Sequence, residues 1–469
     1  MTTGQRFAVE PERRVPVAAE VDVVVAGSGI SGMFAALRCG RAGLRTLLID
    51  RLGALGGNMG PGMVVGGSFA GEAGVTLIGG LHGIPRELLE RVEARRVHPA
   101  GIDVDPERSN YAEDVLLVSA VATEMMAEAG VSLLLGTTIA DPIVASGDGG
   151  EPRVAGLFTE NKNGRQAVRT RVVIDATGDG AVAARAGCPM VREVAPNPAW
   201  ADSKIVRPGS NEGDPLHNNM GIYLLVNGID WSAGGDALNR TGINTRLPPM
   251  QRAHVDGGGE VTLRASAGRR MDGVLGVAIT LQGAIDSGDS SHVTQAETLM
   301  RGFALQCAER LRRSAPGCER CYALHLSPVV GARGGPCIDG EYTLTVEDHE
   351  NGERFDDVLF VNVHEGRPPH AGAVEGCDVP YRCLLPRGVD NLLVVGRGAA
   401  YIRRGHDPTG MRARPLVMVL GQAAGVAATL AIESSTTVKG VERRELQRRL
   451  LADGFHLGDA DRLRELGLS

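Results

Sequence analysis

Lysine is almost absent from this sequence. Only Lys162, Lys204 and Lys439 occur among 469 residues, so arginine supplies nearly all of the positive charge. The net charge is −7 and the isoelectric point is near 5.9. Because nucleic-acid-binding proteins are usually basic, this balance argues against general binding of DNA or RNA.

Neither a hydrophobic leader nor a clear membrane span is expected. Residues 1–20 are polar and include Arg13 and Arg14, which predicts a cytoplasmic protein with no signal peptide. The most apolar stretch, residues 415–432, contains Gln422 and is rich in glycine and alanine. Its length is close to that of a membrane helix, but its composition favours a helix packed against a sheet and a ligand.

Cysteines are few and scattered. Eight are present, and only Cys318 and Cys321 form a CxxC pair. A second pair at metal-binding spacing is missing, so we predict no metal and mostly buried, reduced thiols. A redox role or half of a metal site is the alternative for this pair.

Glycine, in contrast, is abundant. The sequence contains 65 glycines in discrete clusters, about twice the usual share of roughly 7%. Clustered glycines indicate tight turns and backbone that closely approaches a ligand. The length allows two or three structural units.

The first glycine cluster follows a predicted buried strand. Residues 21–26 are apolar, residues 27–32 match the GxGxxG pattern, and residues 33–38 favour a helix. A second strand is expected over residues 44–49, and it ends at Asp50. This order of strand, glycines, helix, strand and acid is typical of a dinucleotide-binding fold.

Each glycine of the pattern has a physical role in such a fold. Gly27 permits the tight turn, Gly29 lets a pyrophosphate approach the backbone, and Gly32 lets the helix pack closely on the strand. The helix N-terminus then presents free N–H groups to the phosphates. Asp50 lies where an acid accepts hydrogen bonds from the adenosine ribose.

A second glycine-rich loop, residues 53–62, distinguishes FAD from NAD. NAD-binding domains usually continue directly into a helix at this point. Backbone clearance at Gly56 and Gly57 suits the extended pyrophosphate and ribityl chain of FAD. A plain surface loop is the alternative interpretation.

Two further units of strand and glycine turn occur later. Residues 172–174 lead into a turn at 175–180, and residues 389–395 lead into a turn at 396–398. A sheet assembled from both ends of the chain around an insertion predicts an α/β Rossmann-type FAD-binding domain, glutathione-reductase-like, with an inserted substrate or cap domain. The predicted division is a loose N-terminus at 1–19, an FAD-binding domain at 20–189 and 326–435, the substrate or cap domain at 190–325, and a C-terminal helical segment at 436–469.

The chain resembles the FAD-dependent oxidoreductases described as fumarate reductase or succinate dehydrogenase-like flavoproteins. The resemblance is carried by Val-Pro-Tyr-Arg at 379–382, Asn-Leu-Leu-Val-Val-Gly-Arg at 391–397 and Leu-Gly-Gln-Ala-Ala-Gly at 420–425. It covers roughly half of the chain, in residues 21–67, 110–187, 325–346 and 380–431.

The resemblance implies which residues bind FAD. The first glycine turn would hold the pyrophosphate, Asp50 the ribose, and the 56–58 loop the ribityl chain and flavin edge. Ile139 would meet adenine, and the turns at 177–179 and 396–397 would close on the diphosphate and ribityl side. The expected cofactor contacts are Gly27, Gly29, Ser31, Gly32, Asp50, Arg51, Gly56, Gly57, Asn58, Ile139, Thr177, Gly178, Asp179, Gly396, Arg397, Leu416 and Val417.

One stretch departs from the pattern of that family. Its members often carry an acidic residue, a hydroxyl residue and two arginines after a Gly-x-Arg that matches residues 331–333. This sequence instead reads Gly334-Gly335-Pro336-Cys337, although residues 340–345 keep the pattern. One expected wall of the pocket has therefore changed, and we do not carry over the substrate of the family.

The segment 401–414 is the richest in chemically active side chains. It contains arginines, His406 and Tyr401, and it joins the third glycine turn to the apolar helix. Arginines suit an anionic, carboxylate-like substrate, and His406 is the candidate for proton transfer. The predicted catalytic residues are His406, Arg412 and Tyr401. Pairing of the arginines with surface acids or with the FAD diphosphate is the alternative, weighed equally for Arg403 and Arg404.

We therefore predict an FAD-dependent dehydrogenase or oxidase that exchanges a hydride between a small anionic substrate and flavin N5. The alternatives are a fumarate-reductase-like ene reductase and a non-catalytic or electron-transferring subunit. The expected partners are a small-molecule substrate and an electron acceptor, which is either a redox partner or oxygen. A homo-oligomer is compatible with the sequence. We expect no binding to nucleic acid or to a membrane. His82 lies in the loop Gly80-Leu81-His82-Gly83, where a histidine is more often simply a polar residue than a site of covalent flavin attachment.

Overall fold

The computed structural model describes most of the chain. The described residues are 8, 10–62, 77, 80–96, 114–147, 150–191, 217–234, 238–271, 274–332, 334–362, 376–401, 403–404, 407–408 and 414–468.

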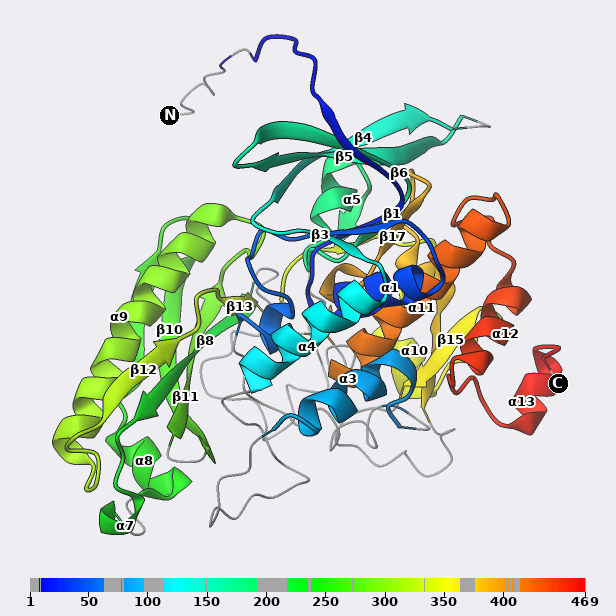
Figure 1. Cartoon of the computed structure of the whole chain (residues 1–469). Helices are drawn as coiled ribbons and strands as arrows, with labels where there is room; N and C mark the ends of the chain where they lie inside the picture. Colours follow the sequence, from blue (N-terminus) through cyan, green and yellow to red (C-terminus); the bar gives the residue numbers. More distant parts are fainter. Residues whose placement is uncertain are drawn as a thin grey trace.

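A parallel sheet forms the centre of the larger part of the molecule (Figure 1). Its strands read as almost uninterrupted apolar runs, and Val23 to Ala26 are completely buried, as expected for a sheet covered on both faces. The order is β3-β2-β1-β6, with β17 pairing on β6. The parallel strands are β1 (Val17–Ala26), β2 (Thr46–Ile49), β3 (Ser132–Leu134), β6 (Gly164–Asp175) and β17 (Leu392–Val394).

The two faces of this sheet are covered differently. Helices α1, α4 and α11 lie on one face, and an antiparallel ribbon that shares the first half of β6 lies over the other (Figure 1). The elements are α1 (Ile30–Arg41), α3 (Gly83–Glu93), α4 (Asp114–Glu128), α5 (Ala181–Arg185), α11 (Arg414–Glu433), β4 (Thr138–Ser146) and β5 (Pro152–Asn161).

Helix α11 is long and apolar enough to cross a membrane by length and composition alone. In the folded chain, 94% of its most apolar window is buried. It packs against α1, and Gly421 lies on the backbone of Ser31. Its apolar composition is therefore accounted for by its place in the core.

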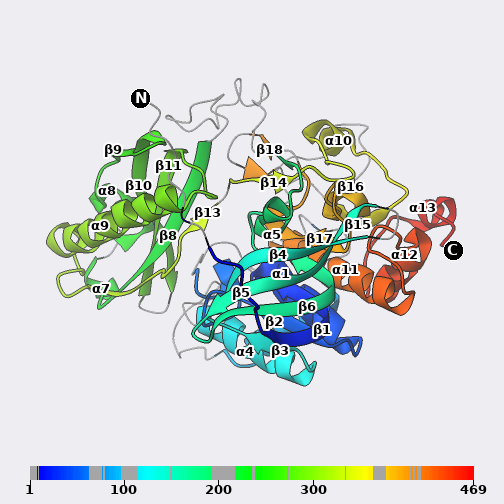
Figure 2. The same ribbon diagram turned by 90° about the horizontal axis from the view of Figure 1, so that it is seen from above.

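A second unit lies to one side of the parallel sheet (Figures 1 and 2). It is a six-stranded sheet whose pairings are all antiparallel, with α9 packed on it, and it has a hydrophobic core of its own. Its elements are β8 (His217–Asn227), β9 (Gln251–Val255), β10 (Gly259–Met271), β11 (Val274–Ala284), β12 (Tyr322–Leu326), β13 (Gly331–Ala332), α7 (Trp231–Gly234), α8 (Arg240–Arg246) and α9 (Ser290–Ser314). We call it the six-stranded unit.

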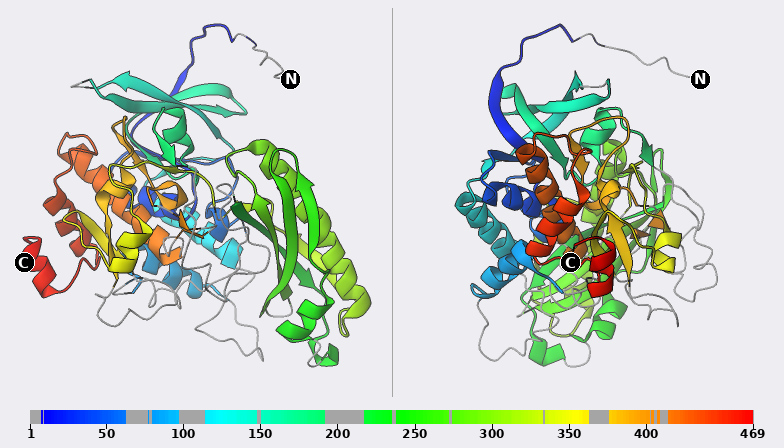
Figure 3. Two further views of the ribbon diagram at one scale, coloured as in Figure 1. Left: turned by 180° about the vertical axis from the view of Figure 1, so that it is seen from behind. Right: turned by 90° about the vertical axis from the view of Figure 1, so that its right-hand side faces the viewer.

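The remaining elements complete the larger part, and the last two helices lie at its outer edge (Figure 3). They are β7 (Met190–Val191), which pairs with β14 (Cys337–Ile338), α10 (Val346–Asn351), β15 (Val358–Asn362), which pairs with β16 (Cys377–Pro380), β18 (Arg403–Arg404), which pairs with β19 (Asp407–Pro408), α12 (Arg443–Ala452), α13 (Ala460–Glu465), and the short 3-10 helices η1 (Gly57–Met59), η3 (Tyr381–Leu384) and η4 (Gly396–Gly398).

The α/β fold predicted from the sequence is confirmed, with two differences at the predicted limits. Strand β1 already begins at Val17, because residues 17–20 pair with β6, so the expectation of a loose segment up to residue 19 is wrong at its end. Strands β12 and β13 pair with β8, so the six-stranded sheet continues past residue 325 to Ala332. Turn signals in the sequence do not reveal such long-range pairing.

Candidate functional site

The ends of four parallel strands meet at one edge of the central sheet. In the strand register, Ala26 is the neighbour of both Ile49 and Asp175, and Asp175 is the neighbour of Val394. The turns that follow these residues are those predicted to bind the cofactor. Ligands of open α/β sheets bind at such a carboxyl edge.

The first turn leaves open space beside the backbone N–H groups at the N-terminus of α1. Gly27 has φ +110°, and a side chain there would lie 2.5 Å from the carbonyl oxygen of Ala176. A side chain at Gly32 would lie 1.9 Å from the Gly27 carbonyl oxygen, so both positions require glycine. At Gly29, in contrast, the nearest atom is 4.0 Å away, and α1 has no side-chain cap. Backbone N–H groups and open space at a helix N-terminus fit a pyrophosphate.

Asp50 lies beside this open space, at the end of β2. Its Oδ2 accepts hydrogen bonds from the backbone N–H and the hydroxyl of Ser28, both at 2.6 Å, and its Oδ1 accepts from Leu52 N at 2.8 Å. The side chain is largely buried, whereas the neighbouring Arg51 is exposed. Ser28 was not among the predicted residues, because the GxGxxG pattern accepts any residue at this position.

The segment predicted to contact adenine is joined to Asp50 through the backbone. Thr137 N–H donates to the Asp50 carbonyl oxygen at 2.9 Å, and Ile139 follows two residues later at the start of β4. Ile139 is partly buried against the core. The predicted contact of Ile139 with adenine stays a prediction.

The second glycine loop packs directly on the first. Gly56 N–H donates to the Ser28 carbonyl oxygen at 2.9 Å, and a side chain at Gly57 would lie 2.9 Å from Gly29 Cα. Both glycines have positive φ, and Asn58 is exposed beside them. The loop therefore borders the same open space as the first turn, which agrees with the FAD interpretation.

A buried carboxylate shapes the turn after β6. Asp175 accepts from the N–H and hydroxyl of Thr177 and from the N–H groups of Val182 and Ala183, at 2.6–3.1 Å. Complete burial raises the pKa of Asp175, and these hydrogen bonds oppose that rise. Its role is to fix the turn that carries Gly178 and Asp179.

Arg397 and Asp179, both predicted to face FAD, also face each other. Arg397 Nη2 lies 2.7 Å from Asp179 Oδ1, and Arg397 Nη1 donates to the carbonyl oxygen of Gly334. Tyr401 is buried, and its hydroxyl donates to the Gly396 carbonyl oxygen. That bond stabilises the third turn, and a catalytic role of Tyr401 stays a prediction.

The start of α11 lies over the first turn. Ser31 Oγ donates to the Val417 carbonyl oxygen at 2.7 Å, and both Leu416 and Val417 are buried. The helix is thus held against the N-terminal turn of α1, across 386 residues of sequence.

The other predicted substrate residues are only partly described. His406 and Arg412 lie outside the described residues. Arg403 and Arg404 form β18, which pairs with β19. Their predicted roles stay predictions.

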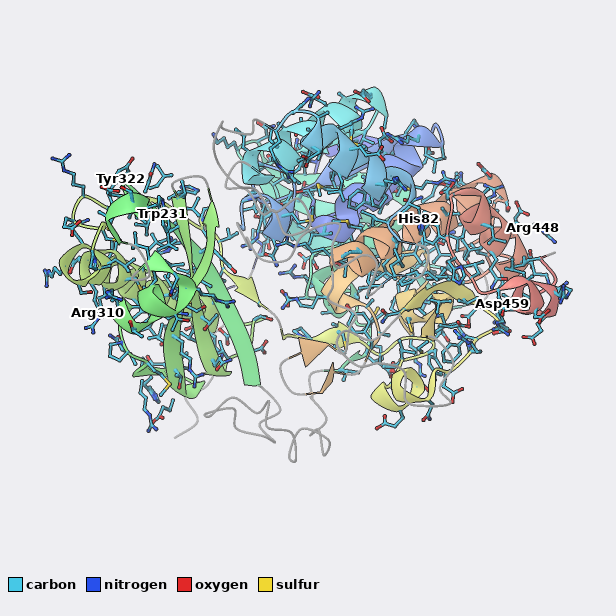
Figure 4. All side chains as sticks on the ribbon, turned by 90° about the horizontal axis from the view of Figure 1, so that it is seen from below. His82, Trp231, Arg310, Tyr322, Arg448 and Asp459 are labelled. Atoms are coloured by element: carbon cyan, nitrogen blue, oxygen red, sulfur yellow. The ribbon has the colours of Figure 1, made fainter. Side chains whose placement is uncertain are left out.

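His82 and the CxxC pair both lie in packed surroundings. The ring of His82, labelled in Figure 4, packs edge-on against Phe455, with ring centres 4.9 Å apart, and burial lowers its pKa. Cys318 and Cys321 are buried within the six-stranded unit, and a hydrogen bond between the thiols raises the pKa of Cys318 and lowers that of Cys321. Within the described part of the chain, no group of three His, Cys, Asp or Glu side chains could hold a metal.

One protein-family model matches most of the chain. The family model described as FAD dependent oxidoreductase matches residues 22–450. A comparison with curated protein sequences gave no significant match.

Similar solved structures cover most of the chain at low identity. A geranylgeranyl bacteriochlorophyll reductase-like protein from Thermoplasma acidophilum is 16% identical, over 93% of this chain and 87% of that chain, with a TM-score of 0.39. A myxobacterial chondrochloren halogenase is 13% identical, over 92% and 79%, with a TM-score of 0.45. The p-nitrophenol 4-monooxygenase of Pseudomonas putida DLL-E4 is 15% identical, over 96% and 93%, with a TM-score of 0.39.

Proposed function

Because the chain belongs to the family of FAD-dependent oxidoreductases, we propose that it exchanges a hydride between its flavin and a small, anionic organic substrate. FAD, when bound, supplies the flavin ring, whose N5 gives or takes the hydride. The protein supplies the position of the substrate, the local charge and a proton donor or acceptor.

The observation that carries this proposal is the meeting of four strand ends at one sheet edge. The uncapped N-terminus of α1 and the open space at Gly29 suit the pyrophosphate. Asp50 retains acceptor capacity for the ribose beside its bonds to Ser28 and Leu52. The second glycine loop, packed on the first, would line the ribityl chain.

The proposed substrate class depends on the arginine-rich segment after β17. This segment joins η4 to α11, and α11 begins beside Ser31 of the first turn. Both ends of the segment, at η4 and at α11, therefore lie next to the turns proposed to bind the cofactor. Arg412 would bind a carboxylate, because guanidinium groups form paired, charge-assisted hydrogen bonds with it. His406 would hold or move the proton.

Two tests address the proposal. The purified protein should release FAD on denaturation, and release of FMN or of no flavin would contradict the cofactor site. Under anaerobic conditions, small hydroxy and amino acids should then be screened for bleaching of the flavin absorbance, with the matching uncharged amides as controls. We expect bleaching by at least one acid and not by its amide.

The alternatives give different results in the same experiment. A fumarate-reductase-like ene reductase would be reoxidised, after chemical reduction, by an unsaturated acid. A flavin that changes only when a second protein is added would support an electron-transferring subunit and overturn the proposed activity.

A further inference from the structure

One cluster of contacts joins the six-stranded unit to the proposed FAD site. Asp179 and Arg397, from the turns after β6 and β17, form the ion pair described above. Ser287, which follows β11, donates from Oγ to the same Oδ1 of Asp179 at 2.9 Å. Gly334, which follows β13, accepts from Arg397 through its carbonyl oxygen. Ser287 of the six-stranded unit, and Gly334 directly after its last strand, thus contact an ion pair that belongs to the turns of the central sheet.

The cluster is partly shielded from water. The side chains of Arg397 and Asp179 are 20% and 26% exposed. Hydrogen bonds that involve a charged group are roughly twice as strong as neutral ones, and partial burial limits their screening by water. The positions of Ser287 and Gly334 therefore influence where the guanidinium and the carboxylate lie.

Gly335 allows the six-stranded unit to approach this closely. Its φ is +129°, and a side chain there would lie 2.3 Å from Ser287 Oγ and 2.7 Å from Asp179 Oδ1. Glycine suits this positive φ, and any side chain here would displace the Ser287 hydroxyl and the Asp179 carboxylate from each other.

Residues 334–337 read Gly-Gly-Pro-Cys. At this stretch the ion pair is contacted by the backbone carbonyl of Gly334, and the side-chain contact comes from Ser287. Cys337 continues the chain into β14, which pairs with β7 of the larger part.

We propose that Ser287 and the backbone at Gly334 are positioning groups of the FAD site. A bare carboxylate at Asp179 would repel the negatively charged cofactor. Arg397 neutralises it, and Ser287 and Gly334 fix the pair in the orientation that admits FAD. The position of the six-stranded unit against the central sheet thereby determines the affinity for FAD. This inference rests on the proposed function only in placing FAD at this sheet edge.

The test compares FAD release from the holoenzyme and four variants, followed by the fluorescence of free FAD. The variants are Ser287→Ala, Arg397→Gln, the double variant, and Ser290→Ala as a matched control at an exposed serine. The thermal unfolding of each apoprotein is measured in parallel.

We expect Ser287→Ala to release FAD about three- to tenfold faster, which corresponds to roughly 0.6–1.4 kcal/mol, because residues of one hydrogen-bonded network are coupled. Arg397→Gln should release FAD faster still, and the double variant should be no worse than Arg397→Gln alone, because Ser287 acts through the ion pair. Ser290→Ala should match the wild type.

Other outcomes overturn the inference. Unchanged release from Ser287→Ala, with or without a lower apoprotein melting temperature, would show a merely structural role. Independent, multiplying effects of Ser287→Ala and Arg397→Gln would also reject it. Unchanged release from Arg397→Gln would instead contradict the placement of FAD at this edge, and with it the proposed site.

Discussion

Asp50 stabilises the first glycine turn and is also predicted to bind the ribose. It accepts three hydrogen bonds from Ser28 and Leu52 while lying at the edge where the ribose is expected. Its two oxygens have more acceptor sites than these donors fill. The sequence indicated the ligand role, and the structure adds the bonds to the first glycine turn.

We expect Asp50→Ala to weaken FAD binding roughly tenfold to a hundredfold, which corresponds to about 1.5–3 kcal/mol for hydrogen bonds to a charged acceptor. Titration of the apoprotein with FAD measures this, with Asp256→Ala, at an exposed turn, as the control. Two backbone N–H groups also lose their acceptor, so the unfolding free energy should fall as well. An unchanged FAD affinity would show that the ribose lies elsewhere.

Arg412 and His406 are expected to act on the substrate and not on FAD loading. Arg412→Ala should raise KM for an acidic substrate, or lower kcat/KM, at a cost of about 1.5–3 kcal/mol for a charge-assisted contact, with FAD content near that of the wild type. His406→Ala should flatten one limb of the pH–rate profile. A colourless or unstable Arg412→Ala protein would instead indicate a contact with the cofactor or with α11.

At the scale of secondary structure, α1 and α11 are in close contact. A side chain at Gly421 would lie 2.0 Å from the Ser31 carbonyl oxygen. The rest of α11 is apolar and buried on nearly all sides. Glycine at this position lets the two helices meet and keeps the start of α11 beside the cofactor turn.

Gly421→Ala should therefore lower the free energy of unfolding by about 1–3 kcal/mol, the usual cost of overpacking. Gly302→Ala is the matched control, because Gly302 lies in α9 with nothing within 4 Å. That change should stabilise the protein by roughly 0.5–1 kcal/mol, since alanine is the better helix former. Urea unfolding measures both, and equal effects would contradict the close packing of the two helices.

At the scale of the whole molecule, the buried thiols link stability to alkaline pH. All eight cysteines are buried, and burial raises the pKa of Cys39, Cys307 and Cys377 to about 12. The unfolded chain ionises near pH 9, so it loses protons that the folded chain keeps. The contribution of these thiols to stability is therefore complete below pH 9 and is lost as the pH rises from 9 towards 12.

Urea unfolding at pH 8, 9 and 10 should show this loss, with each such thiol contributing about 1.4 kcal/mol per pH unit above pH 9. Cys39→Ala should give a shallower decline than the wild type, because one of the linked groups is removed. Parallel declines in the two proteins would rule out a contribution from Cys39.

The sequence by itself determined the local units. The buried valines of β1, the glycines of the first turn and Asp50 lie within 30 residues of one another, and each has a conformational or chemical reason to be where it is. The turns after β6 and β17 could be identified in the same way, and with them the FAD fold. Such features follow from backbone conformation and short-range patterning.

Only the tertiary structure decided which groups meet. Ser287 contacts Asp179 across 108 residues, and Arg397 contacts Asp179 across 218. The pairing of β12 and β13 with β8, which extends the six-stranded sheet to Ala332, is likewise a long-range choice. These contacts depend on strand register and on the packing of two separate cores, and no local pattern in the chain encodes either.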